Sequence, residues 1–369
     1  MPLQAYQPFK ALYTLIAVAF ETARFPFWIL LYIHTAGRPH RKWTLRQAIR
    51  MRIVKAFLYH SSKVRVAPQL SLAPGTEKER FVVMEPATNS LYTGPTKDSE
   101  IVPTAIGGTW TPAAPTDVSN LEVVLHFHGG AYVIGDGRDR DTGFLARTLI
   151  KHAQATHVFT PQYRLSSSAQ GQFPAALQDA ITSYSYLVRT VGVPPSRITV
   201  SGDSAGGNLT IALLRYIEEH GADTGLPSPG CVWLWSPWTN IAAGLDAHEM
   251  ESSPNYSTDY LNSEFGSWGA HTFTAGKDAL QPYVTAYGNP FACKTPIWVQ
   301  TGDAEILYEE DTEFVQQMES VKGNKIELFV SEAMPHDIIL VGRILGFETE
   351  AAAAAKKAGE FLRAERAHL

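Results

Sequence analysis

A serine enclosed by glycines, in the pentapeptide GDSAG with Ser204 at its centre, is the strongest chemical signal in the sequence. The apolar run Ile198–Ser201 precedes it, and a helical pattern follows to His220. In a tight turn between a strand and a helix, the serine hydroxyl projects above the sheet, and the glycines leave room for the turn. A serine held in this way attacks acyl carbonyl groups and forms an acyl-enzyme. We therefore predict that Ser204 is a nucleophile.

A second signal, His128-Gly129-Gly130, ends the apolar run Leu121–Phe127. Acyl transfer passes through a tetrahedral oxyanion, which needs hydrogen-bond donors aimed at it. Glycines let the backbone come close and present bare N–H groups. We expect Gly129 and Gly130, together with the N–H of Ala205, to form this oxyanion hole, and we expect His128 to be structural.

Four motifs occur in order, namely HFHGGAYVIG, PQYRL with FPAALQDA, GDSAGGN and MPHD. Together they resemble the hormone-sensitive-lipase-like branch of the α/β-hydrolases, over roughly residues 120–345. The resemblance implies a carboxylester hydrolase with a Ser–acid–His triad and a helical cap. One departure is that Ala131 replaces the third glycine of the usual HGGG, although it is not one of the donors assigned above. The N-terminal third and the middle segment are loosely similar to fungal hydrolases of secondary metabolism.

The general base of such a triad comes late in the chain. His336 follows the apolar run Ile326–Val330 and the turn-like Glu332-Ala-Met-Pro335, which places it on a loop at the edge of a sheet. His271 is the alternative.

The triad acid is expected after the apolar run Ile297–Thr301, within the stretch TGDAEILYEED. Asp303 comes first, but the family pattern is an acid, any residue, leucine, and a second acid two residues later. Glu305, followed by Leu307 and Glu309, fits that register. We assign Glu305 as the triad acid and keep Asp303 as the alternative.

The elements that must position these residues alternate along the chain, and a repeated strand–helix alternation predicts an α/β fold with a mostly parallel sheet. We predict an α/β-hydrolase fold with about eight strands flanked by helices and a helical cap. The expected strands are 81–84, 109–112, 121–127, 157–160, 198–201, 231–235, 297–301 and 326–330. The expected helices are 173–190, 204–220, 308–320 and 345–367.

Two segments do not follow this strand–helix alternation. Residues 1–70 indicate helices without a strand, and residues 240–290 are rich in aromatic side chains and lack a regular period. We interpret residues 1–70 as an N-terminal helical cap that could contact a membrane, and residues 71–369 as the catalytic domain with 240–290 as a cap insertion. Six aromatic side chains either line an apolar substrate pocket or form the core of the cap: Trp238, Tyr256, Tyr260, Phe265, Trp268 and Phe273.

The N-terminus carries two apolar runs, Ala11–Phe20 and Phe25–Ile33, each shorter than the roughly 20 residues that span a bilayer. An interfacial segment, a tilted anchor and a cleaved signal all remain open. Because the positive start is thin and no small-x-small cleavage site follows, we expect a cytoplasmic or membrane-associated protein rather than a secreted one.

Composition excludes some classes of partner and site. The net charge of −5 and the absence of a basic run with interleaved aromatics argue against a nucleic-acid partner. The two cysteines form neither a disulfide framework nor a zinc spacing. No metal cluster, dinucleotide fingerprint or P-loop accompanies the motifs, so we expect no metal and no cofactor.

We therefore predict a serine carboxylester hydrolase that acts on a small apolar ester. Two alternatives stay open. The enzyme could transfer, cyclise or release a polyketide-like acyl chain, or the fold could serve as a non-catalytic receptor for a small molecule.

Overall fold

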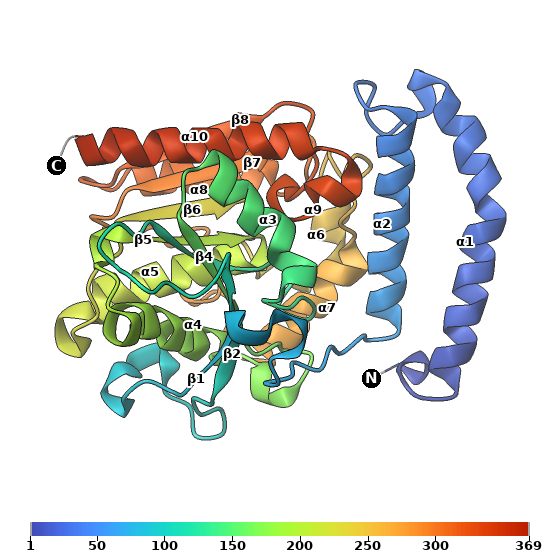
Figure 1. Ribbon diagram of the computed structural model, residues 1–369. Coiled ribbons are helices and arrows are strands. Elements are labelled where there is room, and N and C mark those ends of the chain that lie inside the picture. Colours follow the sequence, from blue (N-terminus) through green and yellow to red (C-terminus); the bar gives the residue numbers. More distant parts are fainter. Residues whose placement is uncertain (1, 368–369) are drawn as a thin grey trace.

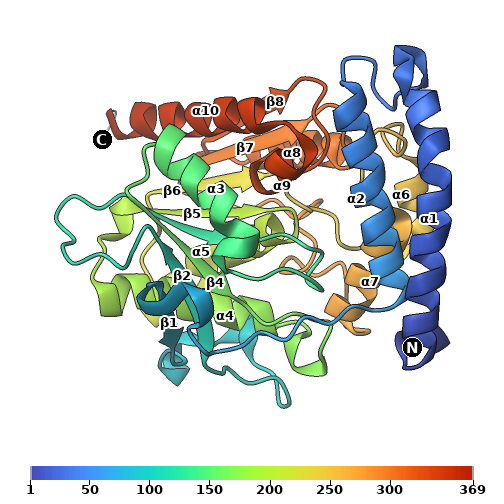
Figure 2. The ribbon, with the colours of Figure 1, turned by 45° about the vertical axis from the view of Figure 1, so that its right-hand side comes forward.

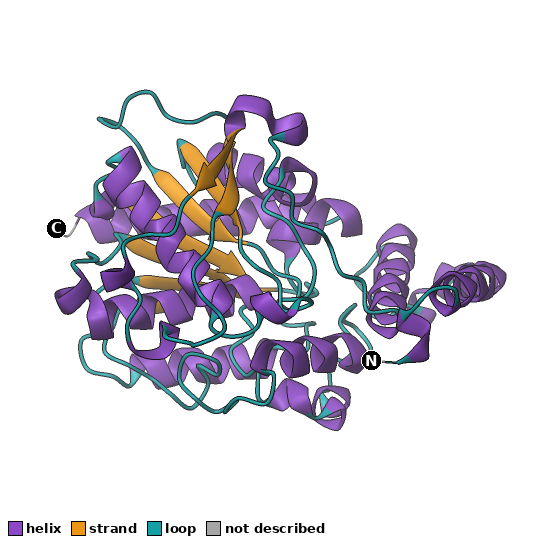
Figure 3. Ribbon diagram, turned by 90° about the horizontal axis from the view of Figure 1, so that it is seen from below, coloured by secondary structure: helices purple, strands orange, loops and turns teal. Residues whose placement is uncertain are grey.

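An eight-stranded sheet with helices on both faces forms the centre of the computed structural model, which describes residues 2–367 (Figures 1 and 3). The strand order is β1-β2-β4-β3-β5-β6-β7-β8. Strand β2 is antiparallel to both β1 and β4, and the other neighbours are parallel. The strands are β1 Phe81–Met84, β2 Ile106–Thr111, β3 Val123–Phe127, β4 His157–Gln162, β5 Ile198–Asp203, β6 Cys231–Trp235, β7 Ile297–Gly302 and β8 Ile326–Ser331. The predicted fold class and the eight predicted strands are confirmed.

Helices cover the sheet because its central strands are apolar on both faces. Helix α3 packs against α10, and α4 packs against α5. The helices are α1 Phe9–Ile33, α2 Leu45–Lys63, α3 Asp139–His152, α4 Ala175–Ser185, α5 Ala205–Thr224, α6 Ala247–Ser252, α7 Ser263–Thr274, α8 Tyr308–Glu319, α9 Ile338–Leu345 and α10 Glu348–Ala367. Helices α3 and α9 were not predicted, and α6 and α7 lie in the predicted cap insertion.

Glycines account for two boundaries that differ from the prediction. Strand β2 starts three residues before the predicted Thr109, because Gly107 and Gly108 hide its apolar pattern. A Cβ on Gly108 would lie 2.3 Å from the Phe159 ring, so the strand needs glycine there. The predicted helix 345–367 begins later, because Gly346, at φ +91°, ends α9 and separates it from α10.

The N-terminal segment forms a helical hairpin beside the sheet domain (Figure 2). The two predicted apolar runs are one continuous helix, α1, which includes Pro26 and is long and apolar enough to cross a membrane. The expectation of two separate short runs was therefore wrong. Helix α2 starts with a capping box between Thr44 and Gln47 and packs between α1 and the cap helix α7. The split at residue 70 stays a prediction.

Candidate active site

Ser204 occupies the tight turn between β5 and α5. Its backbone has φ 51° and ψ −119°, a strained conformation for a residue with a side chain. The turn closes only because glycines flank it, since a Cβ on Gly206 would lie 1.9 Å from the carbonyl oxygen of Phe127. The Ser204 N–H donates to the Trp235 carbonyl at 2.9 Å, which ties the turn to the neighbouring strand β6.

The parallel register brings four loops to one edge of the sheet. Strands β5, β6, β7 and β8 are consecutive neighbours. Ser204 follows β5, Ser236 follows β6, Glu305 follows β7 and His336 follows β8. The carboxyl ends of parallel strands lie at the same edge, which is where open α/β sheets bind ligands. Residues spread over more than 130 positions of the sequence therefore share one site.

Glu305 and His336 lie next to each other and are both buried. His336 Nδ1 lies 3.5 Å from Glu305 Oε2, a distance at which the carboxylate attracts a protonated imidazole without forming an ordinary hydrogen bond. The same oxygen accepts a hydrogen bond of 2.7 Å from Ser236 Oγ, and Ser236 Oγ accepts one of 3.1 Å from the Asp337 N–H. Burial lowers the pKa of His336, but the Glu305 carboxylate outweighs burial, and the pKa is raised overall.

The alternative acid and the alternative base lie elsewhere. Asp303 is half-buried and its Oδ1 accepts the Ala333 N–H at 2.5 Å, so its carboxylate orders the loop after β8. No contact joins Asp303 to His336 within residues 2–367. His271 is exposed in the last turn of α7.

The loop after β3 differs from the expectation for Gly129. The Gly129 N–H donates to Asp203 Oδ2 at 2.7 Å, so it is not free to bind an oxyanion. Asp203 is buried, and its other oxygen contacts His126 Nε2 at 2.8 Å. Burial favours the neutral form of Asp203, but His126 outweighs it and lowers the pKa.

The N–H groups next in the loop belong to Gly130 and Ala131, at φ +111° and +52°. Neither has a hydrogen-bond acceptor within residues 2–367. Ala205 starts α5, where N–H groups have no partner inside the helix. The N–H groups of Gly130, Ala131 and Ala205 are therefore available as donors, whereas that of Gly129 is occupied. The sequence did not predict that the Gly129 N–H is occupied, because nothing in the HGG motif shows which backbone N–H donates to the Asp203 carboxylate.

A small apolar pocket opens beside Ser204. Its free volume is about 20 Å³, and a water molecule needs about 10–15 Å³ by the same measure. The residues that line it are Ala131, Ser204, Trp238, Met250, Leu261, Phe265, Gly266 and Leu307. Met250, Leu261, Phe265 and Gly266 lie within residues 240–290, so the predicted cap insertion forms one wall.

Of the six predicted pocket aromatics, Trp238 and Phe265 line this pocket. Tyr260 lies against His336, with ring centroids 5.8 Å apart. Phe273 stacks on Tyr132 at 3.8 Å, in the core beneath the cap. The remaining two, Tyr256 and Trp268, contact the cations of Lys55 and Arg65.

The contacts by which the cap loop positions Glu305 were not predicted. Asn255 Nδ2 donates to the Glu305 carbonyl at 3.0 Å, and Asp259 Oδ2 accepts the Ile306 N–H at 2.8 Å. Lys55 Nζ, from α2, donates to the carbonyl oxygens of Tyr256 and Asp259 at 2.6 and 2.9 Å. The N-terminal hairpin thus holds the cap loop, and the cap loop holds Glu305. No periodicity in the sequence marks these contacts.

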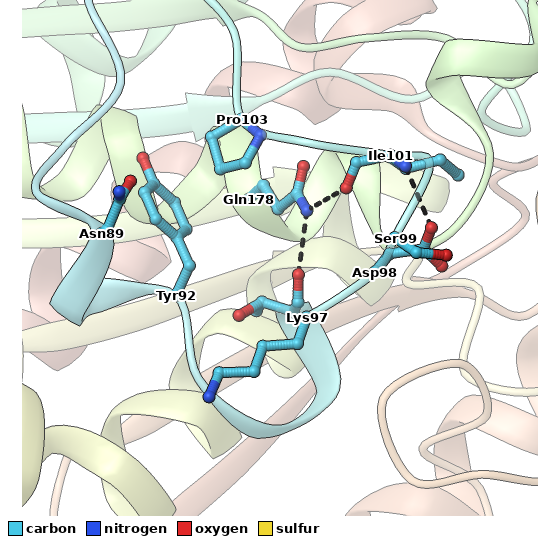
Figure 4. A pocket seen from close by; sticks show the side chains of 9 residues that line it. Asn89, Tyr92, Lys97, Asp98, Ser99, Ile101, Pro103 and Gln178 are labelled. Atoms are coloured by element: carbon cyan, nitrogen blue, oxygen red, sulfur yellow. Dashed lines mark hydrogen bonds between the residues drawn. The ribbon is translucent and has the colours of Figure 1, made fainter.

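A larger recess of about 480 Å³ contains none of the predicted site residues (Figure 4). Its main polar side chain, Gln178, donates to the carbonyl oxygens of Thr96 and Ile101 at 2.9 and 2.8 Å. Asp98 accepts two backbone N–H groups of its own loop. The polar groups therefore order the loop from residue 89 to residue 103.

Comparison with known proteins gives consistent results. A family model described as the alpha/beta hydrolase fold matches residues 124–340. An acetyl-hydrolase of Streptomyces hygroscopicus is 27% identical over 201 residues, which are 54% of this chain and 62% of that protein. An ethyl acetate hydrolase of Pseudomonas putida is 26% identical over 228 residues, which are 60% of this chain and 67% of that protein. The match thus spans less than two thirds of the Streptomyces protein.

Among solved structures, an esterase from the bacterial hormone-sensitive lipase family superposes with a TM-score of 0.60 at 23% identity. The match covers 86% of this chain and 98% of that one. At this identity the likeness shows the fold. The looser resemblance to fungal hydrolases of secondary metabolism stays a prediction.

Proposed function

The chain belongs to the α/β hydrolase fold family, and from that premise we propose that it is a serine hydrolase that cleaves carboxylic esters with a short acyl group. One observation carries the proposal. Ser204 stands in a strained strand-to-helix turn and borders an enclosed apolar pocket, on the sheet edge that also carries the His336–Glu305 pair. The acetyl- and ethyl acetate hydrolases among the relatives support the same reaction class.

The reaction proceeds through an acyl-enzyme. Ser204 Oγ attacks the ester carbonyl carbon while His336 takes the hydroxyl proton, and Glu305 orients the imidazole and stabilises its charged form. The N–H groups of Gly130, Ala131 and Ala205 bind the oxyanion. The intermediate then expels the alcohol, which receives the proton from His336. Water resolves the acyl-enzyme by the same steps, with His336 again acting as the base.

The pocket supports a short acyl group. A free volume of about 20 Å³ is little more than one water molecule needs, so the pocket suits a small acyl group better than a long chain, which would require the cap to move. This size favours ester hydrolysis over the alternative in which a polyketide-like chain is released or cyclised.

Purified protein with p-nitrophenyl acetate, butyrate and decanoate tests the proposal. We expect kcat/KM to fall from the acetate to the decanoate. We also expect a fluorophosphonate probe to label the wild type and not Ser204→Ala. A protein that is neither active nor labelled, yet binds an ester unchanged, is a receptor instead. Turnover of a carrier-bound acyl thioester with no activity on short esters supports the acyl-transfer alternative.

We also propose that α1 lies in the surface of a lipid bilayer. Its large exposed apolar side chains are Phe9, Leu12, Leu15, Ile16, Val18, Phe20, Phe25, Phe27, Leu30, Leu31 and Ile33. Several of its polar groups face α2 instead. Glu21 pairs with Arg52 at 3.0 Å, and the Tyr13 hydroxyl contacts His60 Nδ1 at 2.9 Å.

This pairing argues against α1 crossing the bilayer alone. Moving Glu21 away from Arg52 into hydrocarbon would cost several kcal/mol. A helix that keeps its polar side on α2 and its apolar side outward instead suits the interface. Arg41 lies in the loop between α1 and α2, and Arg46 lies in the first turn of α2. Both side chains are exposed, and their positive charges would attract anionic headgroups.

Flotation with vesicles of phosphatidylcholine and phosphatidylserine tests this placement. We expect the full chain to float with the vesicles and the double variant Leu12→Glu/Ile16→Glu to remain in solution. Leu280→Glu, at an exposed apolar residue outside the hairpin, is the matched control and should bind like the wild type. Equal binding of the double variant and the wild type would show that α1 does not contact the lipid. Self-association of the wild type without vesicle binding would make a second copy the partner.

A further inference from the structure

A threonine hydroxyl lies between two buried carboxyl groups behind the proposed triad. Thr301 Oγ1, near the end of β7, is 2.5 Å from Glu305 Oε1 and 2.9 Å from Asp311 Oδ2. Asp311 lies in the first turn of α8, and both acids are fully buried. Thr301 and Asp311 are not members of the Ser204–His336–Glu305 triad proposed above.

Counting hydrogens shows that one of the two acids is neutral. A threonine hydroxyl carries a single hydrogen, and an ionised carboxylate can only accept hydrogen bonds. If both acids were ionised, one of the two short contacts would join two oxygens with no hydrogen between them. One carboxyl group must therefore carry a proton and donate it to Thr301 Oγ1.

The surroundings select Asp311 as the neutral acid. Glu305 faces His336 and accepts the Ser236 hydroxyl through Oε2, so both of its oxygens have polar partners. Asp311 has no ion-pair partner in the described part of the chain, and its Oδ1 is buried without a hydrogen bond. An ionised carboxylate with a bare buried oxygen is costly, whereas a neutral acid tolerates it.

The charges around Asp311 act in the same direction. The titratable groups that face it are Glu305, from the loop after β7, and Glu310, from its own helix. Burial and the negative charge of Glu305 raise the pKa of Asp311 well above its usual range. A raised pKa favours the protonated form of Asp311, in the same direction as the hydrogen count.

We propose that Asp311 is a protonated positioning residue, which donates its carboxyl proton to Thr301 so that the Thr301 hydrogen is directed to Glu305 Oε1. Glu305 is then fixed through one oxygen, and its other oxygen is presented to His336. The inference rests on the proposed function, because it assigns Asp311 to the support of the triad acid.

Variants at the two positions separate a positioning role from simple packing. Thr301→Val keeps the volume and removes the hydroxyl, and we expect kcat to fall about 10–100-fold with little change in KM, as for lost outer-shell hydrogen bonds. The acid limb of the kcat/KM profile should move to lower pH, because His336 loses part of its contact with Glu305. Thr301→Ser keeps the hydroxyl and should restore both values. Glu309→Gln, exposed on the same helical turn, is the matched control and should leave them unchanged.

Asp311 itself gives the decisive comparison. An amide can donate to Thr301 as a protonated acid does, so Asp311→Asn should stay within about threefold of the wild-type kcat, whereas Asp311→Ala should fall like Thr301→Val. The infrared difference between the wild type and Asp311→Asn should contain the carbonyl stretch of a neutral carboxylic acid, which reports the proton even if activity is unchanged.

Two results would overturn the proposal: absence of that infrared band, or loss of activity in Asp311→Asn as large as in Glu305→Gln. Failure of the proposed function has another signature. In that case Ser204→Ala would retain the wild-type activity, while the neutral-acid band would still be present.

Discussion

Replacement of Glu305 by glutamine tests the central electrostatic contact of the site. The change removes the charge that lies 3.5 Å from His336 Nδ1 and keeps the shape of the side chain. At an effective dielectric constant of about 20, two unit charges at this distance attract by about 5 kcal/mol. Since each 1.36 kcal/mol is tenfold in rate, kcat should fall about 10³–10⁴-fold, the scale of triad-acid losses.

The fold should tolerate Glu305→Gln. The amide oxygen can still accept the Thr301 hydrogen, and the amide N–H can donate to Ser236 Oγ in place of the hydrogen bond that the carboxylate accepted. The midpoint temperature of thermal unfolding should therefore change little, while kcat falls by the factor given above. Because Glu305 raises the pKa of His336, its removal lowers that pKa, and the acid limb of kcat/KM should shift to lower pH.

Initial rates with p-nitrophenyl acetate between pH 5 and 9 measure both effects. Asp303→Asn is the matched control, because Asp303 accepts the Ala333 N–H and does not contact His336; it should lose less than about tenfold. A large loss in Asp303→Asn together with a small loss in Glu305→Gln would refute the reasoning and move the triad acid by two positions.

The other predictions concern the oxyanion loop, the cap and the pH dependence of stability. Asp203→Ala leaves the Gly129 N–H buried without an acceptor, and urea unfolding should show a loss of about 1–3 kcal/mol that Asp203→Asn largely avoids. Phe265→Ala widens the pocket and should raise the decanoate-to-acetate ratio of kcat/KM, whereas Phe273→Ala, stacked on Tyr132 outside the pocket, should not. Lys55→Met removes the donor that holds the cap loop and should lower kcat several-fold, while the exposed Lys151→Met leaves it unchanged. Burial and neighbouring acids raise the pKa of Glu310 to about 7, so the native state binds the proton more tightly than the unfolded chain. The resulting stability is present below about pH 4.5 and is lost as the pH rises to about 7. Because Glu310 is partly exposed in the structure, the loss should be below the roughly 3 kcal/mol that the full shift corresponds to. Unfolding of Glu310→Gln should lack this dependence on pH.

Much of the fold was predictable because its signals are local. The strands from β3 to β8 are short segments rich in apolar residues, and the motif around Ser204 requires a strand before it and a helix after it. Strand β2 was placed only in part, because Gly107 and Gly108 interrupt its pattern and are required by rings that come from β1 and β4. Helix α1 was divided in two because Glu21, Arg24 and Pro26 look like interruptions. The acid in fact pairs with Arg52 on a neighbouring helix.

The sequence by itself determined the chemistry proposed for this protein: a serine in a glycine-flanked turn, a late histidine, and an acid after the penultimate strand. These assignments follow from side-chain types and from spacing along the chain. Only the tertiary structure decided which backbone N–H groups remain free. The carboxylate of Asp203, at the end of β5, accepts the N–H of Gly129, which follows the neighbouring strand β3. The tertiary structure likewise decided that Thr301 joins Glu305 to Asp311, and that a lysine from the N-terminal hairpin holds the cap loop. Hydrogen bonds satisfy buried groups wherever the fold brings partners together, and that pairing is not written in the order of the residues.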